Sequence, residues 1–342
     1  MSPASSSSRE PRAVIFGAGG TALTDDEKKF FRSADPLGFI LFARNCENPT
    51  QVKKLVTELR EAVRREDAPV LIDQEGGRVA RLKPPHWPAY PPAAAVAALN
   101  NPTEAAFLGA RLMADDLAAL GITVDCAPVL DLPAPGSDPI IGDRAYGTNP
   151  ETVATLGRAV CDGLLAGGVL PVIKHIPGHG RAGVDSHLAL PVVSAPRSEL
   201  EAADFAPFRA LHHMPWAMTA HIVYSAIDAE HPATLSPRLI SETIRTSIGF
   251  GGVLISDDLS MKALPGSLPG RAKGAWEAGC DVVLHCNGEL KEMTGIARAV
   301  GPLSAACRQR LDAGEKRRLA GRQPFERRVA EARFSSLLEG RA

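Results

Sequence analysis

Residues 170–191 read LPVIKHIPGHGRAGVDSHLALP, and this stretch indicates both the fold and the place where chemistry would occur. Its first residues, Leu170–His175, form a short apolar run of the kind found in parallel strands that are buried on both faces. The polar loop that follows brings one Lys, three His and one Asp into fourteen residues, Lys174 to His187. A solvated loop does not need three histidines, and a core tolerates them only with partners. We therefore interpret the stretch as a strand that leads into a reaction centre, rather than as a helix cap with scattered polar residues.

Short apolar runs rich in Val, Ile and Leu recur along the whole chain, separated by segments with helical periodicity. The segment Thr103–Leu120 carries a stripe of Leu and Met on one helical face, and Asn101-Pro102 before it is a typical helix start. Asn48-Pro49 and Asn149-Pro150 predict two more starts of this kind. Strands are predicted at Ala13–Gly17, Gly38–Phe42, Pro69–Asp73, Ile122–Val129, Leu170–His175, Ala217–His221, Gly252–Ser256 and Asp281–Cys286. The other helices are predicted at Asp25–Ala34, Pro49–Arg65, Glu151–Ala166, Arg197–Leu211, Pro237–Ser247, Pro269–Ala278, Leu290–Ala313 and Phe325–Leu338.

Eight strand–helix units predict a single (β/α)8 TIM barrel with parallel strands and a C-terminal helical extension. The doubly wound alternative stays open, although the glycine cluster after the first strand, residues 17–20, does not match G-x-G-x-x-G. We predict a disordered N-terminal tail at residues 1–11 and the catalytic barrel at residues 12–315. Residues 316–342 are predicted to form a helical extension packed on the barrel.

The charge balance argues against several classes of partner. The chain has 38 basic and 39 acidic residues and a formal net charge of −1, which disfavours binding to nucleic acid or to a membrane surface. The N-terminal residues lack the apolar core of an export signal, and no apolar run is long enough for a membrane span. None of the six cysteines forms a C-x-x-C pair, as is typical of a reducing compartment. We therefore expect a cytoplasmic protein.

Polar residues follow successive predicted strands, at the end where barrel enzymes build their active sites. The residues so placed are Asp73 and Arg81 after the third strand, Arg144 after the fourth, Lys174 and His175 on the fifth, and Asp257 and Asp258 on the seventh. Such side chains suit hydrogen bonds to a polyhydroxylated or anionic substrate. The aromatic content of 5% gives no stacking cleft for a polymer, so we expect a small substrate in a compact pocket.

Two features predict the chemistry. Asp185 and His187 are two residues apart, so in an extended segment the carboxylate can fix the tautomer of the imidazole and make it a general acid and base. The alternative is a loop stabilised by an Asx turn. Asp257, the first carboxylate after its strand, can act as nucleophile, electrostatic stabiliser or metal ligand, and we favour it over Asp258.

The chain resembles the β-N-acetylhexosaminidases of glycoside hydrolase family 3, of the NagZ type, over roughly residues 13–300. The motifs that carry the resemblance are IDQEGGRVAR (72–81), KHIPGHG (174–180) followed by DSH (185–187), MTAHIVY (218–224), PATLSP (232–237) and SDDLSM (256–261). The resemblance implies that Asp257 is the nucleophile, that His187 is the proton donor and acceptor, and that Asp185 is its partner. It also implies that N-acetylglucosamine is held by Asp73, Arg81, Arg144, Lys174 and His175.

The reaction implied by the resemblance is retaining hydrolysis through a covalent glycosyl-enzyme, with a His in place of the usual acid/base carboxylate. The family's usual task is cell-wall recycling, in which terminal GlcNAc is removed from peptidoglycan fragments such as GlcNAc-1,6-anhydro-MurNAc muropeptides. We expect a monomer that binds a small muropeptide or another GlcNAc-containing sugar, with no cofactor and no metal.

Three alternatives remain open from the sequence. A β-N-acetylglucosaminide phosphorylase of the same family would accept phosphate in place of water, because a neutral imidazole does not repel phosphate as a carboxylate does. A metal-dependent hydrolase would use His175, His179, His187 and Asp257 as ligands. A non-catalytic sugar-binding barrel is the alternative from a different functional class.

Overall fold

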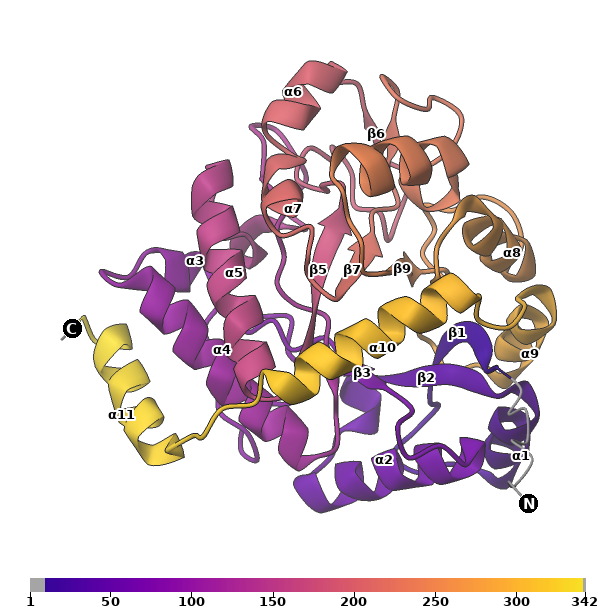
Figure 1. Cartoon of the computed structure of the whole chain (residues 1–342), viewed down its shortest axis with the longest axis horizontal. Helices are drawn as coiled ribbons and strands as arrows, with labels where there is room; N and C mark the ends of the chain where they lie inside the picture. The colour runs from indigo at the N-terminus through magenta and orange to yellow at the C-terminus, as the bar shows by residue number, and fades with distance from the viewer. Residues whose placement is uncertain (1–9, 341–342) are drawn as a thin grey trace, which may run out of the picture.

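The computed structural model describes residues 10–340, and its centre is a closed barrel of eight parallel strands (Figure 1). The strands are β1 (Arg12–Gly17), β2 (Pro36–Leu41), β3 (Val70–Ile72), β4 (Val124–Asp125), β5 (Leu170–Ile176), β7 (Trp216–Thr219), β9 (Val253–Asp258) and β10 (Val282–His285). They follow one another around the barrel in chain order, and β10 pairs with β1 to close it. This confirms the predicted TIM barrel and excludes the doubly wound alternative.

Helices surround the barrel. They are α1 (Asp25–Ala34), α2 (Pro49–Val63), α3 (Ala93–Ala97), α4 (Pro102–Ala119), α5 (Pro150–Ala166), α6 (Arg197–Ala202), α7 (Ala206–Ala210), the π-helix η4 (Leu239–Ser247), α8 (Leu268–Ala278), α9 (Leu290–Ala299), α10 (Ala305–Ala320) and α11 (Arg327–Leu338). The predicted caps at Asn48 and Asn149 are confirmed, since each side chain accepts a hydrogen bond from a backbone N–H of its first turn. The helix start predicted at Asn101-Pro102 is confirmed as well, but the Asn101 side chain donates to Glu104 and makes no cap hydrogen bond to the helix backbone.

Two predicted helices are interrupted. Residues 290–313 divide into α9 and α10 because Gly301-Pro302 lies between them, and proline cannot continue a helix. Residues 197–211 divide into α6 and α7 at Asp204, whose buried carboxylate accepts a hydrogen bond from Arg181. A two-stranded parallel sheet, β6 (Val192–Val193) with β8 (Val223–Tyr224), was not predicted.

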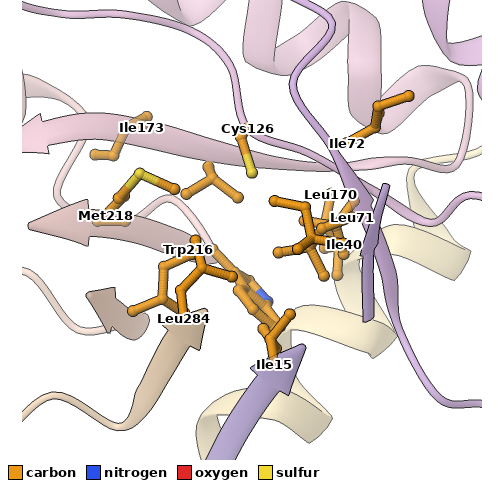
Figure 2. Close-up of a cluster of buried hydrophobic side chains, with 14 of the residues drawn as sticks. Ile15, Ile40, Leu71, Ile72, Cys126, Leu170, Ile173, Trp216, Met218 and Leu284 are labelled. Carbon is orange, nitrogen blue, oxygen red and sulfur yellow. The ribbon is translucent and has the colours of Figure 1, made fainter. Parts of the chain in front are cut away.

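The interior of the barrel is filled by apolar side chains (Figure 2). Ile15, Leu71, Trp216 and Leu284 come from four different strands and are all buried. Branched and aromatic side chains from neighbouring strands pack such a barrel as a solid core rather than a pore.

Helix α10 crosses the amino-terminal ends of the strands (Figure 1). Gly314 of this helix lies against Pro215 and Trp216 at the start of β7, and Arg318 donates to the carbonyl of Gly168 just before β5. Since α10 closes this end of the barrel, the opposite, carboxyl end is left for a binding site.

Helix α11 packs on the outside of α4, where Phe334 is buried against Gly109 and Arg327 pairs with Asp115 and Asp116. The boundary predicted at residue 316 falls within α10, and the division into barrel and extension stays a prediction. The predicted tail lies outside the described residues for residues 1–9, whereas Glu10 pairs with Arg308. No helix among the described residues is long and apolar enough to cross a membrane.

Candidate active site

A cavity of about 260 Å³ opens at the carboxyl ends of the strands. It is lined by Phe42, Asp73, Glu75, Arg78, Val79, Arg81, Ile140, Ile141, Arg144, Lys174, His175, His179, Ser186, His187, Met218, Asp257, Asp258, Met261 and Leu284. Every predicted site residue is in this set except Asp185, which lies behind His187. Segments from β3 to β10 therefore meet at one site, as the strand-end pattern predicted.

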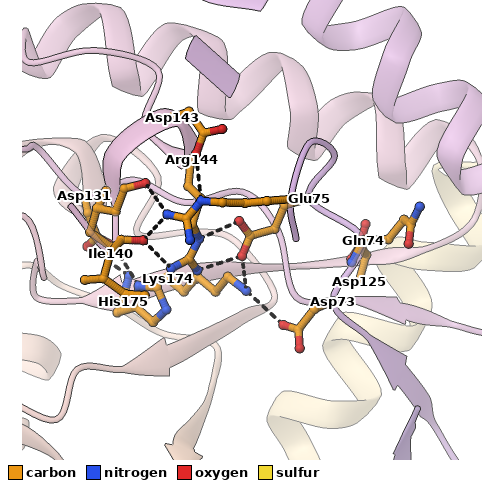
Figure 3. A network of polar contacts seen from close by, with 12 residues as sticks. Asp73, Gln74, Glu75, Asp125, Asp131, Ile140, Asp143, Arg144, Lys174 and His175 are labelled. Carbon is orange, nitrogen blue, oxygen red and sulfur yellow. Dashed lines mark hydrogen bonds and ion pairs between the residues drawn. The ribbon is translucent and has the colours of Figure 1, made fainter. Parts of the chain in front are cut away.

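One wall of the cavity is a network of fixed charges (Figure 3). The buried ammonium of Lys174 lies 2.9 Å from Asp73 Oδ1 and 2.7 Å from Glu75 Oε1. Arg144 donates from Nε and Nη2 to the two oxygens of Glu75, at 2.8 Å each. Arg81 donates to the other oxygen of Asp73 at 2.9 Å. Each side chain is thus oriented by at least one partner of opposite charge, which fixes hydrogen-bonding groups in place before a ligand arrives.

The network keeps its carboxylates ionised although they are largely buried. Burial alone would raise the pKa of Asp73, but the charges of Lys174 and Arg81 and their hydrogen bonds hold it well below its usual range. The pKa of Glu75 is likewise lowered by Lys174 and Arg144 against the effect of burial. Burial lowers the tendency of Lys174 to hold a proton, yet the two carboxylates raise its pKa above the ordinary value.

We expect Lys174→Met to lower the free energy of unfolding by about 3–5 kcal/mol, because the variant leaves two buried carboxylates without their shared cation. Denaturant unfolding at neutral pH measures the loss. Lys54→Met is the matched control, since Lys54 is exposed in α2 and its ion pair with Glu58 contributes at most about 1 kcal/mol. Equal stability of the two variants would contradict the role given to Lys174.

His175 is held by a buried aspartate. Asp131 accepts a hydrogen bond from Nδ1 of His175 at 2.6 Å and, through its other oxygen, from the backbone N–H groups of His175 and His179. Burial would raise the pKa of Asp131, but His175 lowers it below the ordinary value. The carboxylate therefore stays charged and fixes the ring of His175 at the cavity wall.

Asp257, at the end of β9, presents its carboxylate to the cavity. Its Oδ1 accepts a hydrogen bond from the backbone N–H of Asp258 at 2.8 Å. Burial would raise its pKa, but the nearby charges of His175, His221 and Lys174 and the Asp258 N–H lower it, so the group is an anion at neutral pH.

The neighbouring carboxylate of Asp258 is occupied by local contacts. It accepts hydrogen bonds from the N–H and hydroxyl of Ser260 and from the N–H of Cys286. This difference supports the choice of Asp257 over Asp258 as the carboxylate available to a ligand.

Asp185 and His187 form a pair at the rim of the cavity. Asp185 Oδ1 accepts hydrogen bonds from Nδ1 and from the backbone N–H of His187, each at 2.8 Å. Burial would raise the pKa of Asp185, but these hydrogen bonds and the charge of His187 lower it. With Nδ1 engaged, Nε2 is the nitrogen of His187 left to exchange a proton at the cavity. The His187 side chain is 59% exposed, which keeps it in contact with solvent protons.

His179 is buried beneath this pair. Its Nε2 lies 2.9 Å from the hydroxyl of Ser186, while its Nδ1 has no hydrogen-bond partner among the described residues. Within residues 10–340 no group of three or more His, Cys, Asp or Glu side chains is arranged to hold a metal ion. The metal-site alternative, which needs His175, His179, His187 and Asp257 together, thus finds no ligand set in this arrangement.

We expect the folded protein to lose stability in acid because His179 is buried. Burial, and then the charge of His175, lower its pKa from the ordinary 6.5 to about 4. Between these pH values the imidazole binds a proton in the unfolded chain but not in the folded chain. The contribution of His179 to stability is therefore fully present above pH 6.5 and is lost as the pH falls towards 4. We expect His179 to lower the free energy of unfolding by about 3 kcal/mol over that range.

Urea unfolding at pH 7 and pH 4.5 measures this effect. His179→Gln should show a smaller decrease in the free energy of unfolding on acidification than the wild type, whereas the exposed His86→Gln should not. An unchanged decrease in His179→Gln would contradict the prediction.

Glu75 and Asp131 belong to the site but are absent from the set of site residues that the sequence predicts. Glu75 lies within the predicted motif IDQEGGRVAR, and Asp131 follows β4, so their positions gave a signal. Their roles depend on Lys174, Arg144 and His175, which come from distant segments. Arg81, a predicted site residue, also stacks on the ring of Phe42, with 4.9 Å between its guanidinium carbon and the ring centroid.

Comparison with known proteins identifies the family of this chain. The profile described as "Glycosyl hydrolase family 3 N terminal domain" matches residues 19–319. A β-hexosaminidase of Alkalilimnicola ehrlichii is 42% identical over 283 residues, which is 80% of each chain. One of Neisseria meningitidis is 42% identical over 290 residues, 81% of this chain and 79% of the relative.

Among solved structures, NagZ from Neisseria gonorrhoeae in complex with N-trifluoroacetyl-D-glucosamine is 33% identical, with a TM-score of 0.85 over 96% of this chain and 99% of that one. A family 3 β-N-acetylglucosaminidase from a Paenibacillus strain is 32% identical, with a TM-score of 0.84 over 95% and 67%. These matches confirm the resemblance that the motifs carry. The chain belongs to glycosyl hydrolase family 3 and is a glycoside hydrolase.

Proposed function

We propose that the chain is a retaining exo-β-N-acetylglucosaminidase that works through a covalent glycosyl-enzyme intermediate. The observation that carries the proposal is one cavity that presents both an ionised, accessible carboxylate, Asp257, and a carboxylate-paired imidazole, His187. The similarity to β-hexosaminidases, and to NagZ in complex with N-trifluoroacetyl-D-glucosamine, supports an N-acylated glucosamine as the bound sugar.

In the first step a carboxylate oxygen of Asp257 attacks the anomeric carbon, and the bond from that carbon to the glycosidic oxygen breaks. Protonated His187 gives the proton on Nε2 to the departing oxygen, so the aglycone leaves as an alcohol. Asp185 stabilises the charged imidazolium through Nδ1. In the second step water attacks the same carbon from the side that the aglycone left. His187 takes the water proton, Asp257 is released, and the sugar keeps its β configuration.

The charged wall suits the recognition of one sugar ring. Asp73 accepts and Lys174 and Arg81 donate hydrogen bonds at fixed positions, which matches the alternating donor and acceptor character of vicinal hydroxyls. Arg144 and His175 complete this set of binding residues. A cavity of about 260 Å³ holds a single pyranose rather than a polymer, so cleavage at the non-reducing end is expected.

The substrate we propose is a small peptidoglycan fragment, such as a GlcNAc-1,6-anhydro-MurNAc muropeptide, cleaved during cell-wall recycling in the cytoplasm. The proposed enzyme is a monomer and needs no cofactor. The net charge of −1 and the absence of a spanning helix among the described residues are compatible with a small dissolved sugar as the partner.

The test follows the products from GlcNAc-1,6-anhydro-MurNAc and from an aryl β-N-acetylglucosaminide, each with and without inorganic phosphate. Proton NMR at early times should show β-N-acetylglucosamine as the first product in both buffers. N-acetylglucosamine 1-phosphate as the main product would make the enzyme a phosphorylase, and the α-anomer as first product would exclude retention. Binding of the sugar with no turnover would favour the non-catalytic alternative.

A further inference from the structure

The loop that carries Asp185 and His187 touches the barrel through the residue between them. Ser186 is only 2% exposed, whereas Val184 and Leu188 on either side are 42% and 67% exposed. Asp185 and His187 are hydrogen-bonded to each other. Ser186 is therefore an inward-facing residue between the exposed side chains of Val184 and Leu188.

Ser186 makes two contacts, to two different parts of the active site. Its hydroxyl lies 2.9 Å from Nε2 of His179, which follows β5. Its carbonyl accepts a hydrogen bond at 3.2 Å from the N–H of Ala263, in the segment that follows Asp257. The loop is thus attached both to the strand that holds the sugar-binding residues and to the segment after the nucleophile.

His179 is a rigid anchor for this contact. Its backbone N–H donates to Asp131, the same buried carboxylate that fixes His175, and its ring stands at 60° to the ring of His175 with 5.5 Å between centroids. Gly180, directly after it, lies so close to the loop after β4 that an added Cβ would be 1.9 Å from the carbonyl of Leu132. The backbone around His179 therefore has little room to move.

The hydrogen bond is made by a neutral imidazole. His179 is neutral at physiological pH because burial, and then the charge of His175, lower its pKa to about 4. A neutral ring has one donor and one acceptor nitrogen, and the Ser186 hydroxyl can pair with either, so the contact forms in both tautomers.

We propose that Ser186 and His179 are positioning residues, which form a latch that holds His187 where it can protonate the glycosidic oxygen. The inference rests on the proposed role of His187. The latch restrains the segment at the buried residue between Asp185 and His187, so removal of the hydroxyl leaves the Asp185–His187 pair intact but free to shift. A shift of about 1 Å in a reacting group can cost about 100-fold in rate.

The test uses aryl β-N-acetylglucosaminides whose phenols range from dinitrophenol to unsubstituted phenol. A good leaving group departs without a proton, whereas a poor one needs the general acid. We expect Ser186→Ala to lower kcat/KM about 10- to 100-fold for the phenyl glycoside and to stay close to wild type for the dinitrophenyl glycoside. His179→Gln should behave alike, and the double variant should lose no more than either single variant. Ser241→Ala, in the exposed part of η4, is the matched control.

Each outcome is informative. A loss that is equal for all leaving groups, no loss at all, or losses that multiply in the double variant would overturn the latch. Failure of the wild type to hydrolyse any of the glycosides would instead overturn the proposed function. Circular dichroism and thermal unfolding of each variant identify a loss of activity that comes from misfolding. If Ser186→Ala misfolds, His179→Gln still tests the hydrogen bond, because it changes the other partner.

Discussion

Replacing Asp257 with Asn is expected to lower kcat for aryl β-N-acetylglucosaminides on the order of 10⁴- to 10⁶-fold, the range seen when one member of a nucleophilic catalytic set is removed. A carboxamide of the same shape keeps the hydrogen bond from the Asp258 N–H but cannot form the ester with the anomeric carbon. Fold and sugar binding should survive, so the dissociation constant for N-acetylglucosamine measured by calorimetry should change little.

The neighbouring Asp258→Asn is the matched comparison. Its carboxylate holds Ser260 and Cys286 in place, so its loss should disturb the site but leave a competent nucleophile. We therefore expect a far smaller decrease in kcat. A reversed order, with Asp258→Asn inactive and Asp257→Asn active, would contradict the assignment. Mass spectrometry after reaction with a 5-fluoro glycosyl inhibitor gives an independent answer, because the label should be on the peptide that contains Asp257 and should be absent from Asp257→Asn.

His187→Ala is expected to lower kcat/KM for poor leaving groups by about 10²- to 10⁴-fold, the usual contribution of a general acid and base. The dinitrophenyl glycoside should be cleaved to the covalent intermediate at a rate close to that of wild type. The second step then becomes slow, because no base activates the water. A burst of phenol followed by slow turnover is the expected time course.

Azide provides the control for this variant. It attacks the intermediate without base assistance, so added azide should restore turnover and yield the β-glycosyl azide. Asp185→Asn should fall between wild type and His187→Ala, because it keeps the imidazole but loses the carboxylate that fixes Nδ1. An unchanged rate in His187→Ala for the phenyl glycoside, or the α-glycosyl azide as product, would contradict the mechanism.

The parts of the fold that the sequence predicts well are those set by local pattern. Each predicted strand contains a short apolar run, and Asp257 lies near the end of β9, close behind such a run, so both can be predicted from neighbouring residues. The strands β6 and β8 have two residues each and give no period to detect. The break between α9 and α10 depends on Gly301-Pro302, a signal that was present but outweighed by helical residues on both sides.

Glu75 and Asp131, which the sequence does not predict as site residues, take their roles from contacts with residues far along the chain. Glu75 pairs with Arg144, 69 residues later, and with Lys174. Asp131 accepts a hydrogen bond from His175, 44 residues later. The sequence around a carboxylate does not show which cation will lie beside it in the folded chain. The burial and charge that determine its protonation state appear only after the barrel closes.

Helix α10, which crosses the amino-terminal ends of the strands, has a consequence for how the sequence of such a chain can vary. Helix α10 braces the strands from the side where they begin, through Gly314 and Arg318, whereas the reactive loops emerge where they end. The helix that braces the barrel and the loops that carry the reactive residues therefore lie at opposite ends of the strands. Loops around the mouth can be exchanged for others that admit a different aglycone while the brace keeps the barrel intact. A directed-evolution library confined to those loops should thus yield a larger share of folded members than one spread over α10.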